Sequence, residues 1–270
     1  MGLRLAAAVA AALVAGSPAS SGARYLHAHE LANGGYAEPG AAADPQLTAW
    51  VTLGLRATNT KPRGPASQYI EQHEDELSSA TDIALAAMAE GGPDRLIARL
   101  RTLERPSGSI GRLVNGTAWA VLAIRAAGRS VRAKTVRWLL ARQARSGGWG
   151  WTRGAVDSND TAAVVQALRS VGVGGRSICR ALEFLARYRN RDGGFELTHG
   201  RGSDAQSTAW VVQAFLAAGR PPPSGALAYL RRLQRPDGSF RYSARYVATP
   251  VWVTAQALPA LARKPFPLRD

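Results

Sequence analysis

One recurring phrase constrains the fold of this chain more than any other feature. It consists of an aromatic residue and a leucine or isoleucine, a polar residue four places later, two small residues and usually a second aromatic. Trp138 to Trp149 is a complete copy. Six copies begin at positions 25, 69, 99, 138, 184 and 229. A repeat of this length indicates stacked supersecondary units, none of which can bury its apolar face alone.

Each unit is predicted to contain two helices. In the fourth unit the first helix is expected over 131–145, where Val136, Leu139 and Leu140 have the spacing of an amphipathic helix. The segment 161–168 that follows is apolar on nearly all sides, which is typical of a buried helix. Amphipathic first helices and apolar second helices predict two concentric layers, and six pairs are enough to close a ring. We therefore expect an all-α chain that forms a single α6/α6 toroid.

The ends of the chain differ from the repeats. A basic start, an apolar run from Leu5 to Ala15 and a small-residue stretch are typical of a secretory signal, cleaved within 16–23. We predict a signal peptide at 1–22, the six-repeat toroid at 23–264 and a C-terminal tail at 265–270. This organisation predicts a protein that is secreted or associated with the cell envelope.

The composition excludes several classes of partner. The formal net charge is +15, carried by 31 Arg and 3 Lys, but arginine is spread over every repeat and no nucleic-acid-binding module is present. No stretch is long enough to span a membrane, so we expect no integral membrane protein. The only cysteine, Cys179, and the four histidines do not form a zinc pattern. We therefore predict no metal and no cofactor.

The loops before the second helices predict a ligand site. If these inner helices run parallel, their N-termini converge on one mouth of the ring, together with the polar loop residues. The barrel beneath this mouth is predicted to be lined by Trp50, Trp119 and Trp210. A concave apolar site with a few convergent polar groups is the default site for a small molecule, here an apolar or amphipathic one. The polar residues expected at the mouth are Asp44, Gln46, Asp82, Asn115, Asp157, Asn159, Asp160, Asp204, Gln206 and Thr249.

The recurring phrase resembles the QW repeat of terpene cyclases. Trp138 to Trp149 and Tyr229 to Phe240 match it fully, whereas Phe184 to Phe195 and Tyr25 to Tyr36 depart only at the glutamine. The resemblance covers essentially the whole chain after the predicted leader. It implies an α/α toroid, the fold shared by prenyltransferase β subunits and by the cobalamin-binding domain of intrinsic factor and transcobalamin. It is more specific for fold than for activity.

A local match points to candidate catalytic residues. The segment Asp157-Ser158-Asn159-Asp160-Thr161-Ala162 resembles the Asp-x-Asp-Asp-Thr-Ala segment of squalene–hopene cyclases, at the same place before an inner helix. In that family the middle aspartate protonates the terminal double bond of the substrate. Asn159 holds this position here, and an amide cannot supply the proton. The resemblance leaves Asp157 or Asp160 as the acid, and the family also builds its site between two toroids.

Three hypotheses of function remain open, and we favour the first. It is a secreted, non-catalytic toroid that binds a corrinoid or an isoprenoid at the mouth. In the cobalamin-binding relatives a second, smaller domain covers the ligand, so this hypothesis expects a second protein domain as a possible partner. The second hypothesis is an active terpene cyclase or isomerase that uses Asp157 or Asp160. The third is a scaffold for protein interactions at the cell envelope.

Overall fold

A computed structural model describes residues 16–152 and 154–268. The apolar run of the predicted signal peptide lies outside these residues, so the signal and the secretion remain predictions. Outer helices alternate along the chain with inner ones. The outer helices are α2 (Pro18–His27), α4 (Ala66–Gln72), α6 (Asp94–Thr102), α8 (Ala133–Ala141), α10 (Arg176–Ala186) and α12 (Ala226–Arg232). The inner helices are α3 (Pro45–Ala57), α5 (Ala80–Ala89), α7 (Val114–Ala126), α9 (Ser158–Ser170), α11 (Ala205–Ala217) and α13 (Pro250–Leu261).

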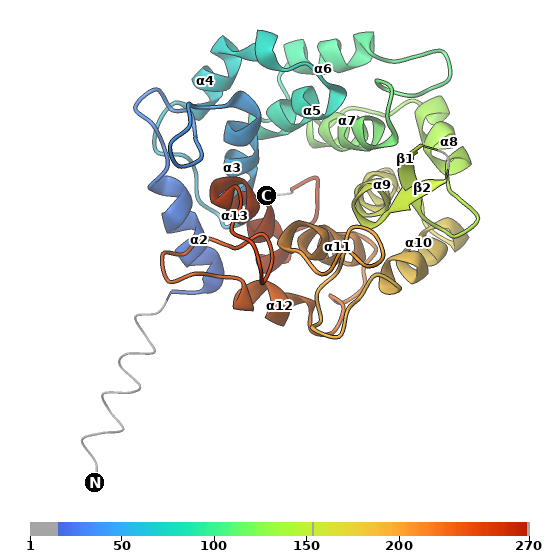
Figure 1. The fold of residues 1–270 in the computed structure, drawn as a ribbon. Coiled ribbons are helices and arrows are strands. Elements are labelled where there is room, and N and C mark those ends of the chain that lie inside the picture. Colours follow the sequence, from blue (N-terminus) through green and yellow to red (C-terminus); the bar gives the residue numbers. More distant parts are fainter. Residues whose placement is uncertain (1–15, 153, 269–270) are drawn as a thin grey trace.

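The helices form a closed ring of two layers (Figure 1). Each inner helix packs against the next one, and α13 packs against α3. The seam between α3 and α13 is tight, because a Cβ on Gly54 would lie only 2.7 Å from the carbonyl oxygen of Ala255. The predicted all-α toroid of six helical hairpins is therefore confirmed.

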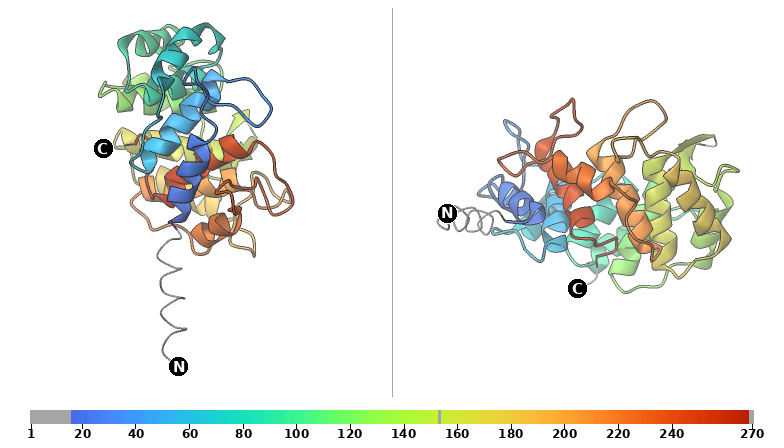
Figure 2. Two further views of the ribbon diagram at one scale, coloured as in Figure 1. Left: turned by 90° about the vertical axis from the view of Figure 1, so that its left-hand side faces the viewer. Right: turned by 90° about the horizontal axis from the view of Figure 1, so that it is seen from below.

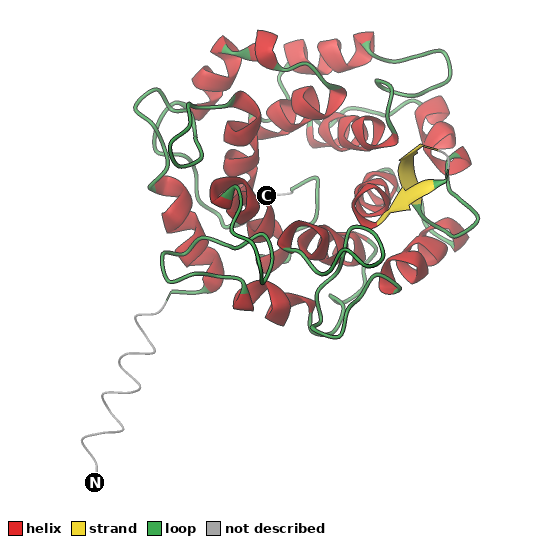
Figure 3. Cartoon of the chain, viewed as in Figure 1, coloured by secondary structure: helices red, strands yellow, loops and turns green. Residues whose placement is uncertain are grey.

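Two short elements were not predicted (Figure 3). A 3-10 helix occupies Glu74–Glu76, and strands β1 (Trp149–Thr152) and β2 (Ala155–Asp157) form an antiparallel pair. Trp149 is opposite Asp157 in this pair, so the hairpin joins the aromatic end of the repeat phrase to the start of α9.

A threonine in the first turn of most inner helices explains the recurring Thr-Ala sequence. The Oγ1 of Thr161 accepts a hydrogen bond from the backbone N–H of Trp149 at 2.9 Å. Thr208 does the same for the N–H of Phe195, also at 2.9 Å. Such a bond satisfies a buried amide that no strand or helix would otherwise pair. Equivalent bonds join Tyr36 to Thr48, Ile110 to Thr117 and Phe240 to Thr254.

Arginine side chains connect neighbouring units. In the last turn of α3, Arg56 donates to the carbonyls of Met88 and Ala89 at the end of α5, at 2.7 Å each. Arg125 and Arg169 bind carbonyls at the C-terminal ends of the next inner helices. A cation at a helix C-terminus is favourable because the last carbonyls are unpaired and carry partial negative charge. These three arginines of inner helices therefore have a structural role at the junctions between units.

The inner helices run parallel, as expected. Bonds between neighbours join N-terminal turn to N-terminal turn, such as Asn115 to Asp160, and C-terminal turn to C-terminal turn, such as Arg56 to Met88. The long loops before the inner helices consequently lie on one face of the ring, and the described segment after α13 lies toward the opposite face (Figure 2). None of the helices in the described part of the chain is long and apolar enough to cross a membrane.

The first outer helix closes the ring and crosses the predicted cleavage region. The side chain of Gln234 donates to the carbonyl of Pro18 at 2.8 Å, and Gly22 packs directly against Leu258. Residues 18–22 therefore belong to the folded ring in this structure. Cleavage after position 22 would remove the first turn of α2 and these contacts.

Candidate active site

The predicted polar residues gather at one mouth of the toroid. Three aspartates cap the inner helices on which they were expected. Asp44 accepts a bond from the N–H of Leu47 at 2.6 Å, and Asp204 accepts one from Ser207 at 2.7 Å. Asp157 does the same for Asp160 at 2.7 Å. A side-chain oxygen at this position satisfies an amide that the first turn of a helix leaves unpaired.

Hydrogen bonds between side chains run from helix to helix around part of the mouth. Gln46 donates to Asp82 across α3 and α5. Thr81 donates to the amide oxygen of Asn115 at 3.3 Å, and the amide nitrogen of Asn115 donates to Asp160 at 2.8 Å. The polar residues therefore form connected pairs across the first turns of four successive inner helices, in addition to capping individual helices. Gln206, which was also predicted, lies partly buried in the first turn of α11.

Asp157 and Asp160 form a carboxyl pair at the N-terminus of α9. Burial and, to a smaller extent, the charge of Asp160 together raise the pKa of Asp157 to about 7. Burial also raises the pKa of Asp160, and the hydrogen bond from Asn115 opposes this increase. A buried carboxyl group next to another carboxylate keeps its proton more strongly because the second charge is unfavourable there. Near pH 7 the pair therefore retains a substantial share of one proton.

Asn159 lies between the two carboxyl groups in sequence and faces a different direction. Thr161 faces the outer layer, where it binds Trp149. A residue two positions away on a helix is rotated by about 200°, so Asn159 faces the axis of the barrel. It is buried, with 9% of its surface exposed. Asp160 is rotated toward α7 instead, in agreement with its bond to Asn115.

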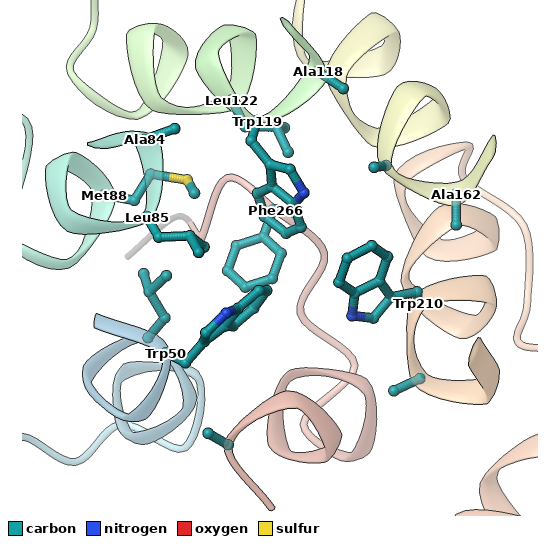
Figure 4. Packing of buried hydrophobic residues seen from close by; sticks show 14 of the residues in the cluster. Trp50, Ala84, Leu85, Met88, Ala118, Trp119, Leu122, Ala162, Trp210 and Phe266 are labelled. Carbon is teal, nitrogen blue, oxygen red and sulfur yellow. The ribbon is translucent and has the colours of Figure 1, made fainter. Parts of the chain in front are cut away.

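The three predicted tryptophans converge at the centre of the barrel (Figure 4). The ring centroids of Trp50 and Trp119 are 5.2 Å apart, and those of Trp119 and Trp210 are 5.3 Å apart. Phe266 from the C-terminal tail enters this cluster and lies 5.4 Å from Trp119. We expected these side chains to line an open apolar cavity. Instead they are buried against one another and against Phe266, because the tail turns back into the lumen.

The tail is held in the lumen by glutamines of the inner helices. The backbone N–H of Phe266 donates to Gln166 at 2.9 Å, and Gln213 donates to the carbonyl of Lys264 at 3.5 Å. A cavity of about 340 Å³ lies beside the tail at this C-terminal end of the barrel. The predicted tail at 265–270 is thus, over its described residues, part of the core.

Two residues that shape the mouth were not among the predicted site residues. Both carboxylate oxygens of Glu38 accept bonds from the first amides of α13, those of Val251 and Trp252. Glu38 therefore caps a helix more than 200 positions away, while Thr249 makes no such bond. Tyr188 is buried near Asp157, and burial and then the charge of Asp157 raise its pKa. No sequence signal could have identified either residue, because each contact joins residues of different units that only the folded ring brings together.

The described residues contain no group of three or more histidine, cysteine, aspartate or glutamate side chains that could hold a metal ion. Three kinds of side-chain group lie at the mouth or beneath it. These are a carboxyl pair that keeps a proton, amides that can orient a ligand, and aromatic rings below them. Aromatic faces attract cations.

The fold and this mouth define a terpene cyclase-like α/α toroid. No protein-family model matches the chain. Over 165 residues, 53% of this chain, it is 33% identical to a drimenyl diphosphate synthase of Streptomyces showdoensis. It is 38% identical over 86 residues, 30% of this chain, to a drimenyl diphosphate synthase of Streptantibioticus cattleyicolor. The matches cover 30% and 16% of those proteins, so the chain spans less than a third of the length of the curated relatives.

Solved structures show the same fold. The type II terpene cyclase MstE from Scytonema, in complex with geranylgeranyl dihydroxybenzoate, superposes with a TM-score of 0.68 at 16% identity. The alignment covers 91% of this chain and 95% of that one. An ent-copalyl diphosphate synthase from Streptomyces platensis superposes with a TM-score of 0.59 at 19% identity, over 81% of this chain and 50% of that one.

These comparisons correct our favoured hypothesis. We expected a non-catalytic binding protein and doubted that the chain is an enzyme, because Asn159 replaces the family's acid and because one toroid seemed too small for the site. The relatives that match in sequence are named as synthases, and a type II cyclase has a chain that this one covers almost completely. The expectation of a non-catalytic toroid is therefore wrong, and the second hypothesis, an active cyclase, agrees better with the findings.

Proposed function

We propose that this chain catalyses the protonation-initiated cyclisation of a linear isoprenoid. The observation that carries the proposal is the carboxyl pair of the half-buried Asp157 and the buried Asp160 at the mouth of a toroid with an aromatic core. The names of the sequence relatives and of the structural neighbours support the same reaction class.

The carboxyl pair provides the acid that the reaction requires. An alkene is a very weak base, so its proton donor must be a carboxylic acid that is protonated and largely removed from water. The raised pKa of Asp157, about 7, keeps a proton available at neutral pH. Asp160 is 7% exposed and is oriented by Asn115. The pair therefore performs the role that the middle aspartate has in squalene–hopene cyclases.

The aromatic core suits the cationic intermediates of such a reaction. Protonation of a terminal alkene produces a tertiary carbocation, which the next double bonds attack in turn. The faces of Trp50, Trp119 and Trp210 can stabilise this positive charge without reacting as bases. In this structure the ring of Phe266 packs against Trp50 and Trp119, so these faces are in contact with an apolar group.

Removal of either carboxyl group should reduce the reaction strongly. We expect Asp157→Asn and Asp160→Asn each to lower kcat by roughly 10²–10⁴-fold, the usual contribution of a positioned acid. The assay would incubate the full chain with farnesyl diphosphate, geranylgeranyl diphosphate and squalene, and detect cyclised products by mass spectrometry. Asp44→Asn is the matched control, because Asp44 caps an inner helix at the same mouth outside the pair. Equal rates for all three variants and the wild type would contradict the assignment.

Introduction of a carboxyl group at position 159 should increase the rate of cyclisation. Asn159→Asp places a carboxyl group on the side of α9 that faces the axis, where it can reach a substrate in the lumen. We expect kcat to increase by about tenfold or more, because the donor is then aligned with the substrate. Circular dichroism would verify that the variant remains folded. A folded Asn159→Asp variant that is slower than the wild type would show that the amide at this position has its own role in the reaction.

A further inference from the structure

A glutamine in the wall of the barrel, Gln256, has no hydrogen-bonding partner among the described residues. Both amide atoms of Gln256 are buried, and neither makes a hydrogen bond with any described residue. The side chain is 1% exposed, so bulk solvent does not satisfy it either. Buried polar groups are nearly always hydrogen-bonded, and an amide without a partner in an apolar environment is strongly destabilising. The group therefore requires an explanation.

The direction of this side chain follows from its helix. Thr254 faces the outer layer, where its Oγ1 accepts the N–H of Phe240 at 3.0 Å. Gln256 is two residues further on and is thus rotated by about 200°, toward the barrel axis. Ala255, between them, faces α3, where it contacts Gly54. Trp50, Trp119 and Trp210 occupy the same position in their helices, two residues after the binding threonine, and they meet at the centre (Figure 4).

Gln256 is consequently a polar member of an aromatic layer. Its neighbouring inner helices α11 and α3 contribute Trp210 and Trp50, whose ring centroids are 6.1 Å apart. Trp119 belongs to the same layer, and its Nε1–H is also buried without a hydrogen-bonding partner among the described residues. Two unpaired polar groups in one layer of the lumen indicate a ligand that carries an oxygen atom to this depth.

Two other glutamines of the lumen, Gln166 and Gln213, do have hydrogen-bonding partners. Gln166 and Gln213 lie five residues after their threonines, nearer the C-terminal end of the barrel, and both bind the backbone of the tail. The tail thus accounts for these two side chains. Over residues 264–268 the chain makes no such contact with Gln256, which is left available for a ligand.

We propose that Gln256 positions a water molecule that ends the cyclisation, so that the product is an alcohol. The inference rests on the proposed function. The acid pair transfers its proton to the terminal alkene, the rings close, and the oxygen of the water forms a C–O bond with the last carbocation. The added water then releases one proton, which equals the proton taken from the acid. The net reaction adds one water molecule to the substrate, with no oxidant or reductant.

An amide at position 256 favours addition of water over loss of a proton as the last step. The amide can orient water by donating and accepting hydrogen bonds, but it is too weak a base to remove a proton from the carbocation and produce an alkene. Trp119 can add one donor through its Nε1–H. An enzyme with an aliphatic residue at position 256 would lack this water site, and loss of a proton would then become the main end of the reaction.

The source of the oxygen can be tested directly with H₂¹⁸O. We expect the wild type to give a cyclised alcohol that contains one ¹⁸O atom. Gln256→Leu should lower the ratio of alcohol to alkene by about tenfold or more, since sites built to bind a polar group discriminate strongly. Trp119→Phe should lower it less. Gln166→Leu is the matched control and should leave the ratio unchanged, because Gln166 binds the tail.

Each outcome separates this inference from the proposed function. A cyclised alcohol without ¹⁸O would show that its oxygen comes from the substrate, and would overturn the water site alone. A cyclised alkene from the wild type, or an unchanged ratio in a folded Gln256→Leu variant, would also overturn it alone. The absence of any cyclised product from the wild type would overturn the proposed function and this inference with it.

Discussion

Single carboxyl groups at the mouth combine two roles, because the same aspartates cap helices and resist ionisation. Burial raises the pKa of Asp157 to about 7 and that of Asp204 to about 6, although each accepts a hydrogen bond from a helix amide. Desolvation therefore outweighs capping at both positions. The chain keeps these aspartates at a cost in stability when they are charged.

This cost predicts a pH dependence of folding. The folded-state pKa of each group lies above its ordinary value, so the folded chain binds protons more tightly than the unfolded chain. The two aspartates should contribute their full share to the free energy of unfolding below about pH 4. This contribution should be lost as the pH rises through 6 and 7. We expect Asp157→Asn to gain about 1–2 kcal/mol relative to the wild type at pH 8 and little at pH 4. Urea unfolding at both pH values measures this difference, and an equal effect at both would contradict the assignment.

The sequence identifies these residues but not their partners. The segment from Asp157 to Asp160 could be recognised from its resemblance to a known motif, and its position before an inner helix was correct. The bond between Asn115 and Asp160 spans 45 positions and depends on the closeness of α7 and α9. Glu38 could not be identified from the sequence either, because the helix that it caps lies at the other end of the chain.

At the scale of elements, a threonine in the first turns of five of the six inner helices joins the two layers. It accepts the amide of the residue that ends the repeat phrase, which is aromatic in four of these units and Ile110 in the third unit. Ile83 occupies the corresponding position in the second unit, whose copy of the phrase is also the weakest. The phrase and the Thr-Ala sequence are thus two parts of one contact.

Removal of one such bond should destabilise the ring locally. We expect Thr208→Val to cost about 1–3 kcal/mol, because the buried N–H of Phe195 loses its acceptor while the volume of the side chain hardly changes. Urea unfolding monitored by tryptophan fluorescence provides the value. Thr198→Val, at an exposed loop position in the same unit, is the control. If the two variants were equally stable, the hydrogen bond between Thr208 and Phe195 would not stabilise the ring, and the threonine would serve only the first turn of its helix.

Helix periodicity predicted the elements better than their ends. The first helix of the fourth unit was expected over 131–145 and is observed over Ala133–Ala141, because the residues after it belong to the turn of the repeat phrase. The hairpin β1–β2 is too short to show a period of its own. The tail was read as a simple extension, since nothing in Pro265-Phe266-Pro267 indicates that the chain turns back into the lumen.

At the scale of the whole molecule, stability depends on the closure of the ring. The turn of the last unit fits against the first outer helix at Gly238, which has φ +93°. A Cβ at this position would lie 2.4 Å from the carbonyl oxygen of Ser21. An open arc would leave α2 and α13 without their partners, so this seam should unfold together with the rest of the ring.

A side chain at the seam should therefore have a large effect. We expect Gly238→Ala to destabilise the protein by about 2–4 kcal/mol, through positive φ and through the clash with Ser21. Gly172→Ala is the matched control, because Gly172 has φ +82° and no neighbouring atom within 4 Å of the added Cβ. Gly172→Ala should lower the free energy of unfolding by about 1 kcal/mol, because only the backbone conformation is unfavourable for alanine there. Similar losses in both variants would show that the seam contributes little.

The central claim is that a proton from the carboxyl pair starts the reaction, and deuterium labelling tests it most directly. The protein would be incubated with a linear isoprenoid in D₂O and the cyclised product analysed by mass spectrometry. Initiation by protonation predicts one deuterium on a carbon that does not exchange with solvent, and no cyclised product from the Asp157→Asn/Asp160→Asn double variant. A cyclised product without deuterium, or the same product from the double variant, would contradict the claim.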